Sequence, residues 1–322
     1  MHHRPSGSET RTSARTNSQG VTHASVQRRV QAGVRRGPSV PSGPYDVTTG
    51  PDDALWFTLI HSGGIARLTP DGALDRHALD SPACGPSIIT PGPDGALWFT
   101  RCQDHRIGRM TVTGHATSFA VATPDSGPYG IAAGGDGALW FTQLHTDRIG
   151  RITVDGRVTE FPLPFRGAFP SAITAGPDQA LWFTLNRADA VGRMDLGGEV
   201  TVHPLPTEHA APVGITVGTD GALWFVEIGA GQVGRVGTDG VVREFPLPDR
   251  ACRPHAITAD PARGVCWFTE WAADRIGSIT PDGHIEEYEL PDRGAEPHGL
   301  TVAPDGALYV ALETGRILRM EL

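Results

Sequence analysis

The chain has 322 residues and a net charge of −9, and its 41 glycines, 27 prolines and 39% hydrophobic residues are typical of many short strands joined by turns. All 27 basic residues are arginines, which excludes Schiff-base lysine chemistry and phosphate-binding P-loops. The apolar runs are far shorter than the roughly 20 residues that span a bilayer, so no membrane partner is expected.

The first 42 residues differ from the rest because they are basic and poor in large apolar side chains. They contain seven arginines and one glutamate, a net charge of +6, so the remaining residues carry −15. We expect residues 1–24 to form a disordered basic tail and residues 25–322 to form one folded domain. The tail has no apolar segment of the kind found in secretion signals, which favours a cytoplasmic location. The acidic domain disfavours nucleic-acid binding.

From residue 44 onward, the sequence repeats seven times in fixed register. A marker proline recurs every 42 or 43 residues, and twelve or thirteen residues later comes a tryptophan, replaced by Tyr309 in the last repeat. The marker prolines are Pro44, Pro86, Pro128, Pro170, Pro212, Pro254 and Pro297. A repeat of this length indicates a solenoid, a propeller or an array.

Within one repeat, four β-rich runs alternate with turn signals. In the third repeat the runs are YGIAAG (129–134), ALWFTQ (138–143), RIGRITV (148–154) and RVTEFPLP (157–164). The dipeptide DG between such runs is a strong hairpin signal, and four antiparallel strands make a propeller blade. The sequence therefore predicts an all-β fold, a seven-bladed β-propeller with four antiparallel strands per blade.

The seventh repeat ends after only three strands, although a closed ring needs a complete last blade. We predict that the missing outer strand comes from the segment before Pro44, within residues 25–37. A ring closed in this way has no free sheet edge that demands a partner, so a monomer is expected.

The geometry of a blade places two kinds of residue at one mouth of the central channel. The residue after each marker proline begins an innermost strand, and the residues after the W-F-T motif end the second strand at the same face. The first set is Tyr45, Ser87, Tyr129, Ser171, Val213, His255 and His298; the second includes Glu227, Glu270, Trp271 and Glu313. This predicts that His255, Glu296, His298 and Glu313 converge from the sixth and seventh blades.

These four residues suit metal-assisted acid–base chemistry. Two carboxylates together with water suit a hard cation such as Mg²⁺. An imidazole nearby suits a general base, because its ordinary pKa lies near neutral pH. Zinc is disfavoured because there is no HExxH motif and no Cys/His cluster. A single histidine at such a position is more often a loop residue satisfied by hydrogen bonds, but two histidines and two glutamates on one rim favour a functional site.

Other reactive residue types have simpler explanations. We expect His61, His105 and His145 to be solvated, because they lie in the variable polar loop after the second strand. The four cysteines, Cys84, Cys102, Cys252 and Cys266, form no CxxC motif and are expected to be reduced thiols. Cys252 lies close to His255 in sequence, but a packing role is favoured over a nucleophile. Serine catalysis lacks a G-x-S-x-G motif.

The repeated GPDGALWFT and DRIGRIT segments, together with RPHAIT, WFTEW, AEPHG and the ALE near the C-terminus, resemble the virginiamycin B lyases, also called streptogramin B lyases. The resemblance extends from about residue 42 to the C-terminus, through all seven repeats. It implies a seven-bladed propeller that uses Mg²⁺ to open the ring of a small cyclic depsipeptide antibiotic by elimination, and so confers resistance.

The resemblance also implies residue roles. Glu296 and Glu313 match the metal-binding glutamates, and His298 matches the general base. His255 matches a histidine that contacts the substrate, and it would position the substrate or protonate the departing oxygen. The remaining substrate contacts expected at this mouth are Tyr45, Tyr129 and Trp271.

The sequence also departs from the family pattern in ways that bear on substrate preference. The first blade reads PYDV where the family has PYGI, so Asp46 replaces a glycine. The glutamate of the W-F-T-E pattern is absent from the first four blades, where Leu59, Arg101, Gln143 and Leu185 stand instead. Arg101 is expected to add a positive charge near the rim.

Two alternatives remain open from the residues alone. The first is a propeller lactone hydrolase that uses the same metal and histidines to activate water. The second is a non-catalytic binding propeller that holds a peptide or a carbohydrate at its rim. A requirement of the function for a metal ion would distinguish either enzyme from a binding propeller. The fold alone does not distinguish these possibilities.

Overall fold

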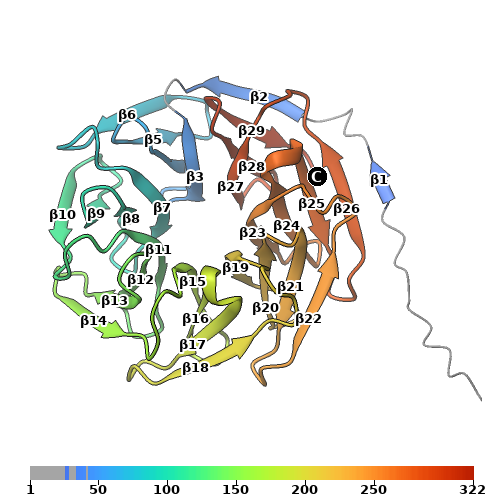
Figure 1. Ribbon diagram of the computed structural model, residues 1–322. Helices are drawn as coiled ribbons and strands as arrows, with labels where there is room; N and C mark the ends of the chain where they lie inside the picture. Colours follow the sequence, from blue (N-terminus) through green and yellow to red (C-terminus); the bar gives the residue numbers. More distant parts are fainter. Residues whose placement is uncertain (1–25, 29–33, 41–42) are drawn as a thin grey trace, which may run out of the picture.

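Short antiparallel strands surround a central channel in the computed structural model, which describes residues 26–28, 34–40 and 43–322 (Figure 1). The first three blades are β3 (Pro44–Thr49), β4 (Leu55–Leu59), β5 (Gly64–Leu68) and β6 (Leu74–Ala78); β7 (Pro86–Pro91), β8 (Leu97–Arg101), β9 (Arg106–Met110) and β10 (Ala116–Ala120); and β11 (Pro128–Ala133), β12 (Leu139–Gln143), β13 (Arg148–Ile152) and β14 (Val158–Pro162).

The next three blades follow the same order. They are β15 (Pro170–Ala175), β16 (Leu181–Leu185), β17 (Ala190–Met194) and β18 (Val200–Pro204); β19 (Pro212–Val217), β20 (Leu223–Glu227), β21 (Gln232–Val236) and β22 (Val242–Pro246); and β23 (Pro254–Asp260), β24 (Val265–Glu270), β25 (Arg275–Ile279) and β26 (Ile285–Glu289). Two short 3₁₀ helices, η1 (Asn186–Ala188) and η2 (Trp271–Ala273), follow the second strands of the fourth and sixth blades. The predicted seven-bladed β-propeller is confirmed.

The seventh blade combines the three C-terminal strands with one strand from the N-terminal part of the chain. Its strands β27 (Pro297–Val302), β28 (Leu308–Leu312) and β29 (Arg316–Met320) are completed by β2 (Val34–Ser39), which pairs antiparallel with β29. The closing strand thus begins and ends later than the window of 25–37 that the sequence indicated. Strand β1 (Val26–Arg28) instead pairs parallel with β26 at the outer edge of the sixth blade. The tail expected at residues 1–24 lies outside the described residues.

The first five blades share a polar triplet of aspartate, tryptophan and arginine that explains the DG and W-F-T signatures. In the first blade, the indole Nε1 of Trp56 donates to Asp52 Oδ1 at 2.9 Å, and Nε of Arg67 donates to Asp52 Oδ2 at 2.7 Å. The Arg67 guanidinium also lies 5.8 Å from the centroid of the fully buried Trp56 ring. A turn aspartate therefore fixes the tryptophan of the second strand and the arginine of the third at once.

The threonine of the W-F-T motif connects neighbouring blades. Thr58 Oγ1 donates to the backbone carbonyl of Ser87 at 2.8 Å, and Thr100 Oγ1 donates to that of Tyr129 at 2.6 Å. The accepting residue is in each case the first after a marker proline. Bonds of this kind fix the positions of four residues that ring the mouth of the channel, namely Ser87, Tyr129, Ser171 and Val213.

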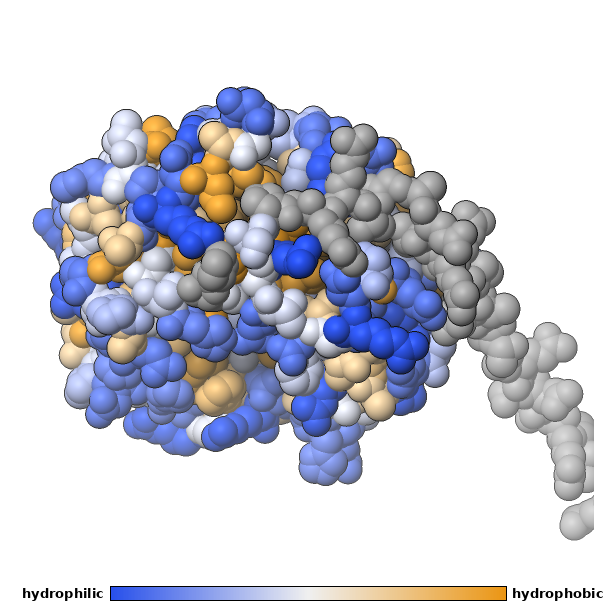
Figure 2. All heavy atoms as spheres, turned by 90° about the horizontal axis from the view of Figure 1, so that it is seen from above, coloured by the Kyte–Doolittle hydropathy of each residue, from blue (hydrophilic) through white to orange (hydrophobic). Residues whose placement is uncertain are grey.

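The outer surface is mostly polar. Figure 2 shows hydrophilic side chains over most of the visible face, with hydrophobic ones scattered among them. Within the described part of the chain, no helix has the length and apolar character needed to cross a membrane. The four cysteines are unpaired, in agreement with the expectation of reduced thiols.

Candidate active site

A β-bulge at the start of each innermost strand directs the residues after the marker proline toward the channel. In the first blade, Pro44 pairs with Leu59 and the next pair is Val47 with Phe57, so Tyr45 and Asp46 lie in the bulge. The same register shift follows Pro297 in the seventh blade. A bulge re-aims side chains locally, which is why the mouth is lined by these residues.

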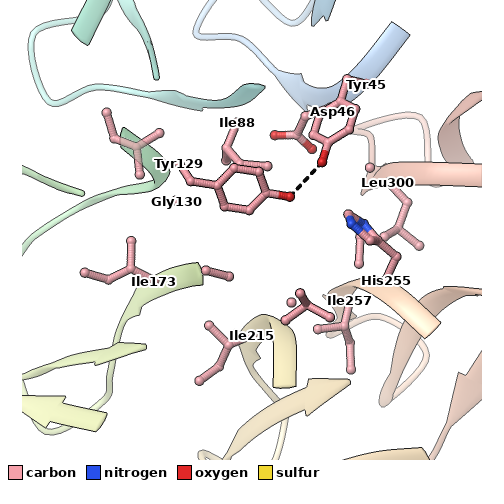
Figure 3. Close-up of a pocket in the computed structure, with 16 residues that line it drawn as sticks. Tyr45, Asp46, Ile88, Tyr129, Gly130, Ile173, Ile215, His255, Ile257 and Leu300 are labelled. Atoms are coloured by element: carbon pink, nitrogen blue, oxygen red, sulfur yellow. Dashed lines mark hydrogen bonds between the residues drawn. The ribbon is translucent and has the colours of Figure 1, made fainter. Parts of the chain in front are cut away.

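Three rings predicted to share one mouth are in contact there. The ring centroids of Tyr45 and His298 lie 4.4 Å apart, those of His255 and His298 lie 4.5 Å apart, and those of Tyr45 and His255 lie 6.1 Å apart. The hydroxyls of Tyr45 and Tyr129 are hydrogen-bonded at 2.7 Å, and both tyrosines face the channel with His255 (Figure 3). Burial raises the pKa of both hydroxyls, that of Tyr129 to about 12, so neither is a base near neutral pH.

The carboxylate of Glu313 fixes the protonation of His298. Its Oε2 lies 2.7 Å from Nε2 of His298, and this hydrogen bond is the main reason that the pKa of Glu313 falls to about 2. An ionised carboxylate only accepts, so Nε2 carries a proton. In the neutral ring, Nδ1 is then the basic atom. It is buried and has no partner among the described residues.

His61 is a member of this site, which the sequence analysis missed. Its side chain is 61% exposed, as expected for a solvated residue, but its Nε2 also donates to Glu313 Oε1 at 2.8 Å. The predicted closed ring could have indicated this contact, because it makes the first and seventh blades neighbours. His105 is also not simply solvated, since its Nδ1 accepts from the backbone N–H of Gly127 at 3.2 Å. His145 is exposed, as expected.

Glu296 stands at the same mouth on a backbone held by Asp274. The Asp274 carboxylate accepts from the N–H groups of Gly294 and Ala295, each at 2.7 Å, and from that of Glu296 at 3.4 Å. Glu296 has a φ of 50°, in the left-handed region that non-glycine residues rarely adopt. The backbone N–H of Glu313 donates to the Glu296 carbonyl at 3.2 Å, so the two glutamates are adjacent in space.

The other carboxylates assigned to the mouth do not lie there. Glu227 and Glu270 are fully buried and bind Gln232 at 2.6 Å and Arg275 at 3.0 Å. They end the second strand, whereas Trp271 is one residue further on and lies against His298, with ring centroids 6.3 Å apart. Because side chains alternate along a strand, one position decides between blade interior and mouth.

Arg101 also differs from its expectation. It is buried at 2% exposure and forms ion pairs with Asp80 at 2.6 Å and with Asp104. Its charge is therefore neutralised by these two carboxylates rather than presented at the rim.

Below the rings, the channel continues as a cavity of about 130 Å³ (Figure 3). Apart from Tyr45, Tyr129 and His255, its walls are mainly aliphatic. They also include the carboxylate of Asp46, whose Oδ2 accepts from the backbone N–H of Ile89 at 2.9 Å. A Cβ at Gly299 would overlap the Asp46 carboxylate, so glycine is needed there. Burial raises the pKa of Asp46 to about 7.

The elevated pKa of Asp46 should make stability depend on pH. The unfolded carboxyl ionises near pH 4. Between about pH 4 and pH 7 the folded protein therefore holds a proton that the unfolded chain releases, and stability falls as the pH rises through this window. Asp46→Asn should remove the effect, so its melting temperature relative to wild type should rise by at least about 2 °C between pH 5 and pH 8. The same shift in Asp239→Asn, at an exposed turn, would contradict this assignment.

Comparison with known proteins now identifies the family. A sequence profile of the Virginiamycin B lyase family matches residues 36–320. The chain belongs to the virginiamycin B lyase family. The virginiamycin B lyase of Saccharopolyspora erythraea is 59% identical over 44 residues, a segment that spans 14% of this chain and 15% of that relative.

Solved structures extend the likeness over the whole propeller. The selenomethionine-substituted virginiamycin B lyase from Staphylococcus aureus is 40% identical, with a TM-score of 0.86 over 90% of this chain and 99% of that one. A streptogramin B lyase structure is 42% identical, with a TM-score of 0.85 over 90% and 97% of the two chains. A catalytically inactive histidine-to-alanine variant of the Staphylococcus aureus enzyme, crystallised with quinupristin, is 40% identical, with a TM-score of 0.86 over 90% and 99%.

This member of the virginiamycin B lyase family has unpaired polar groups at the mouth. Among the described residues, the buried Nδ1 atoms of His255 and His298 and the Nε1 atom of Trp271 have no hydrogen-bond partner. Buried polar groups are normally paired, so three orphans at one mouth indicate a place for a polar ligand.

Proposed function

We propose that this protein linearises streptogramin B-type cyclic depsipeptides by elimination at the threonyl ester, and thereby confers resistance to these antibiotics. The observation that carries the proposal is the His298–Glu313 pair, which leaves the basic Nδ1 of His298 buried and unpaired at the mouth. The quinupristin complex of the Staphylococcus aureus relative supports the substrate class. We expect the protein to act as a monomer on this small substrate in the cytoplasm.

In the proposed reaction, His298 Nδ1 removes the Cα proton of the threonine whose side-chain oxygen forms the ester. The electron pair of that C–H bond becomes the Cα=Cβ double bond, and the Cβ–O bond breaks. The ester oxygen leaves as a carboxylate, and the proton remains on the imidazole until it passes to solvent. No water is added, so the linear product has the mass of the substrate.

Glu313 and His255 support this step in different ways. Glu313 holds Nε2 of His298 and stabilises the imidazolium that forms, as a carboxylate does for a catalytic histidine elsewhere. Burial lowers the pKa of His255 to about 3, so its ring is neutral near pH 7. A neutral ring is a poor proton source, which favours a positioning role for His255.

Glu296 and Glu313 would hold Mg²⁺. Within the described residues, no group of three or more His, Cys, Asp or Glu side chains is arranged to hold a metal ion. Mg²⁺ nevertheless commonly uses only one or two carboxylates and keeps its waters. Glu313 fits this role because it is ionised and each of its oxygens, bound to one histidine, retains a lone pair. The ion would polarise the lactone carbonyl and stabilise the leaving carboxylate.

Mass spectrometry of quinupristin incubated with the protein tests the proposed reaction. We expect a new chromatographic peak of unchanged mass, which is lost when a chelator removes Mg²⁺. A product heavier by one water would show a lactone hydrolase instead. The absence of any product would contradict both enzymes and leave a binding propeller.

Asp274 offers a test of the proposed metal site. Asp274→Ala removes the acceptor that fixes the backbone of Glu296, so the Mg²⁺ concentration for half-maximal activity should rise about tenfold or more. Asp189→Ala is the matched control, because Asp189 accepts from the N–H groups of His209 at 2.8 Å and Ala211 at 2.9 Å, where no glutamate follows. Activity titrations should show the change only in the first variant. Equal Mg²⁺ requirements in both would mean that Asp274 only stabilises the loop.

A further inference from the structure

We propose that Phe169 and Arg187, across the mouth from His298, form a second substrate contact that binds an aromatic group of the cyclic depsipeptide. This inference rests on the proposed function and adds a specificity-determining subsite to it. The subsite lies on the fourth blade, outside the set of residues that the sequence indicated.

Phe169 occupies a position in the repeat where a large aromatic residue is unfavourable. It precedes the marker Pro170 and has a φ of 53°. The equivalent residues in the other blades are Gly43, Gly85, Gly127, Ala211, Arg253 and Glu296. A bulky residue in the left-handed region is a genuine outlier, and such strain is concentrated at ligand-binding sites.

The surrounding structure enforces this conformation. The buried carboxylate of Asp147 accepts from the backbone N–H groups of Gly167 at 2.7 Å, Ala168 at 2.8 Å and Phe169 at 3.3 Å. The backbone N–H of Asn186 donates to the Phe169 carbonyl at 3.2 Å. The backbone therefore holds the side chain of residue 169 at the rim. An aromatic ring lies there only because this residue is a phenylalanine.

Phe169 and Arg187 together form a stacked platform. The Arg187 guanidinium, from η1, lies 4.6 Å from the centroid of the Phe169 ring, and the His145 ring lies 6.1 Å away at 45°. Arg187 and His145 are exposed, whereas Phe169 is half-buried. A guanidinium stacked on one aromatic ring can stack on a second ring with its free face, so the platform suits a planar aromatic group.

The position of the platform suits a substrate that also reaches His298. Phe169 and Glu296 hold the same place in their repeats, so both lie at the same mouth, and their strands β15 and β27 face each other across the channel (Figure 1). The sixth blade carries a related pair, in which the Arg253 guanidinium lies 6.0 Å from the Trp271 ring. A macrocycle at the mouth would thus contact one aromatic–arginine pair beside the base and another opposite it.

The glycine variant separates this role from packing. Phe169→Gly relieves the backbone strain, so its melting temperature should equal or exceed that of wild type. Its KM for quinupristin should rise about five- to tenfold with kcat unchanged, because the ring contributes binding away from the reacting atoms. Ala211→Gly is the matched control, since Ala211 has a φ of 48° in the next blade. It should gain stability without any change in KM.

The outcomes distinguish this subsite from the proposed function itself. An unchanged KM in an active Phe169→Gly enzyme would overturn the subsite and leave the lyase standing. If Phe169→Gly does not fold, the KM of Arg187→Gln for quinupristin tests the same subsite, because this substitution removes the guanidinium and keeps the backbone. No turnover by the wild-type protein would overturn the proposed function, and the subsite with it, before any variant is compared.

Discussion

Replacing His298 with alanine should lower kcat for ring opening by a factor of about 10² to 10⁴, because the reaction loses the atom that we propose removes the Cα proton. The melting temperature should change little, since the imidazole lies at the channel mouth and contacts mainly other rings of the site. Steady-state kinetics on quinupristin, with thermal unfolding measured in parallel, checks both expectations.

The control for this variant is His115→Ala, at an exposed turn of the second blade. It should behave as wild type. Retention of most activity by the His298→Ala enzyme would remove His298 from the role of base and would direct attention to His255, whose Nδ1 is also unpaired among the described residues.

Glu313→Gln should have the second-largest effect, because this side chain carries two proposed functions. The amide has no charge, so the metal site loses one of its two anionic ligands and the Mg²⁺ requirement should rise at least about tenfold. The imidazolium of His298 also loses its ionised partner, so kcat should remain depressed even at saturating Mg²⁺.

A Mg²⁺ titration of activity tests the Glu313→Gln variant, with Glu199→Gln at an exposed turn as its control. An unchanged titration curve would place the metal elsewhere. A raised Mg²⁺ requirement with full recovery of kcat would mean that Glu313 binds the ion but does not support the base.

The propeller could be predicted because its sequence signals recur at a fixed interval. Marker prolines, DG turns and the W-F-T strand recur in fixed register, so blade number and strand order followed from spacing alone. The same register placed Tyr45, His255 and His298 at one mouth, and the structure brings their rings into contact.

The side-chain contacts that the sequence did not show depend on individual positions, which the repeat does not specify. Glu270 and Trp271 are consecutive, yet one pairs with Arg275 in the blade interior and the other lies against His298. His61 joined the site only because the first and seventh blades meet, which brings residues 252 positions apart into contact. Arg101 pairs with Asp104 in the loop after its own strand and with Asp80 in the connection between β6 and β7, and the repeat pattern does not indicate such pairs.

The closure of the ring has a consequence for how the protein acquires activity. Tyr45 and His61 come from the first blade to be synthesised, and His298 and Glu313 come from the last. The two sets meet where the first and seventh blades adjoin at β3 and β27, and β2 completes the seventh blade by pairing with β29. A nascent chain, or one interrupted before its final blade, can build most of its core and still lack the site. The proposed site is therefore complete only when the first and the last blade have come together.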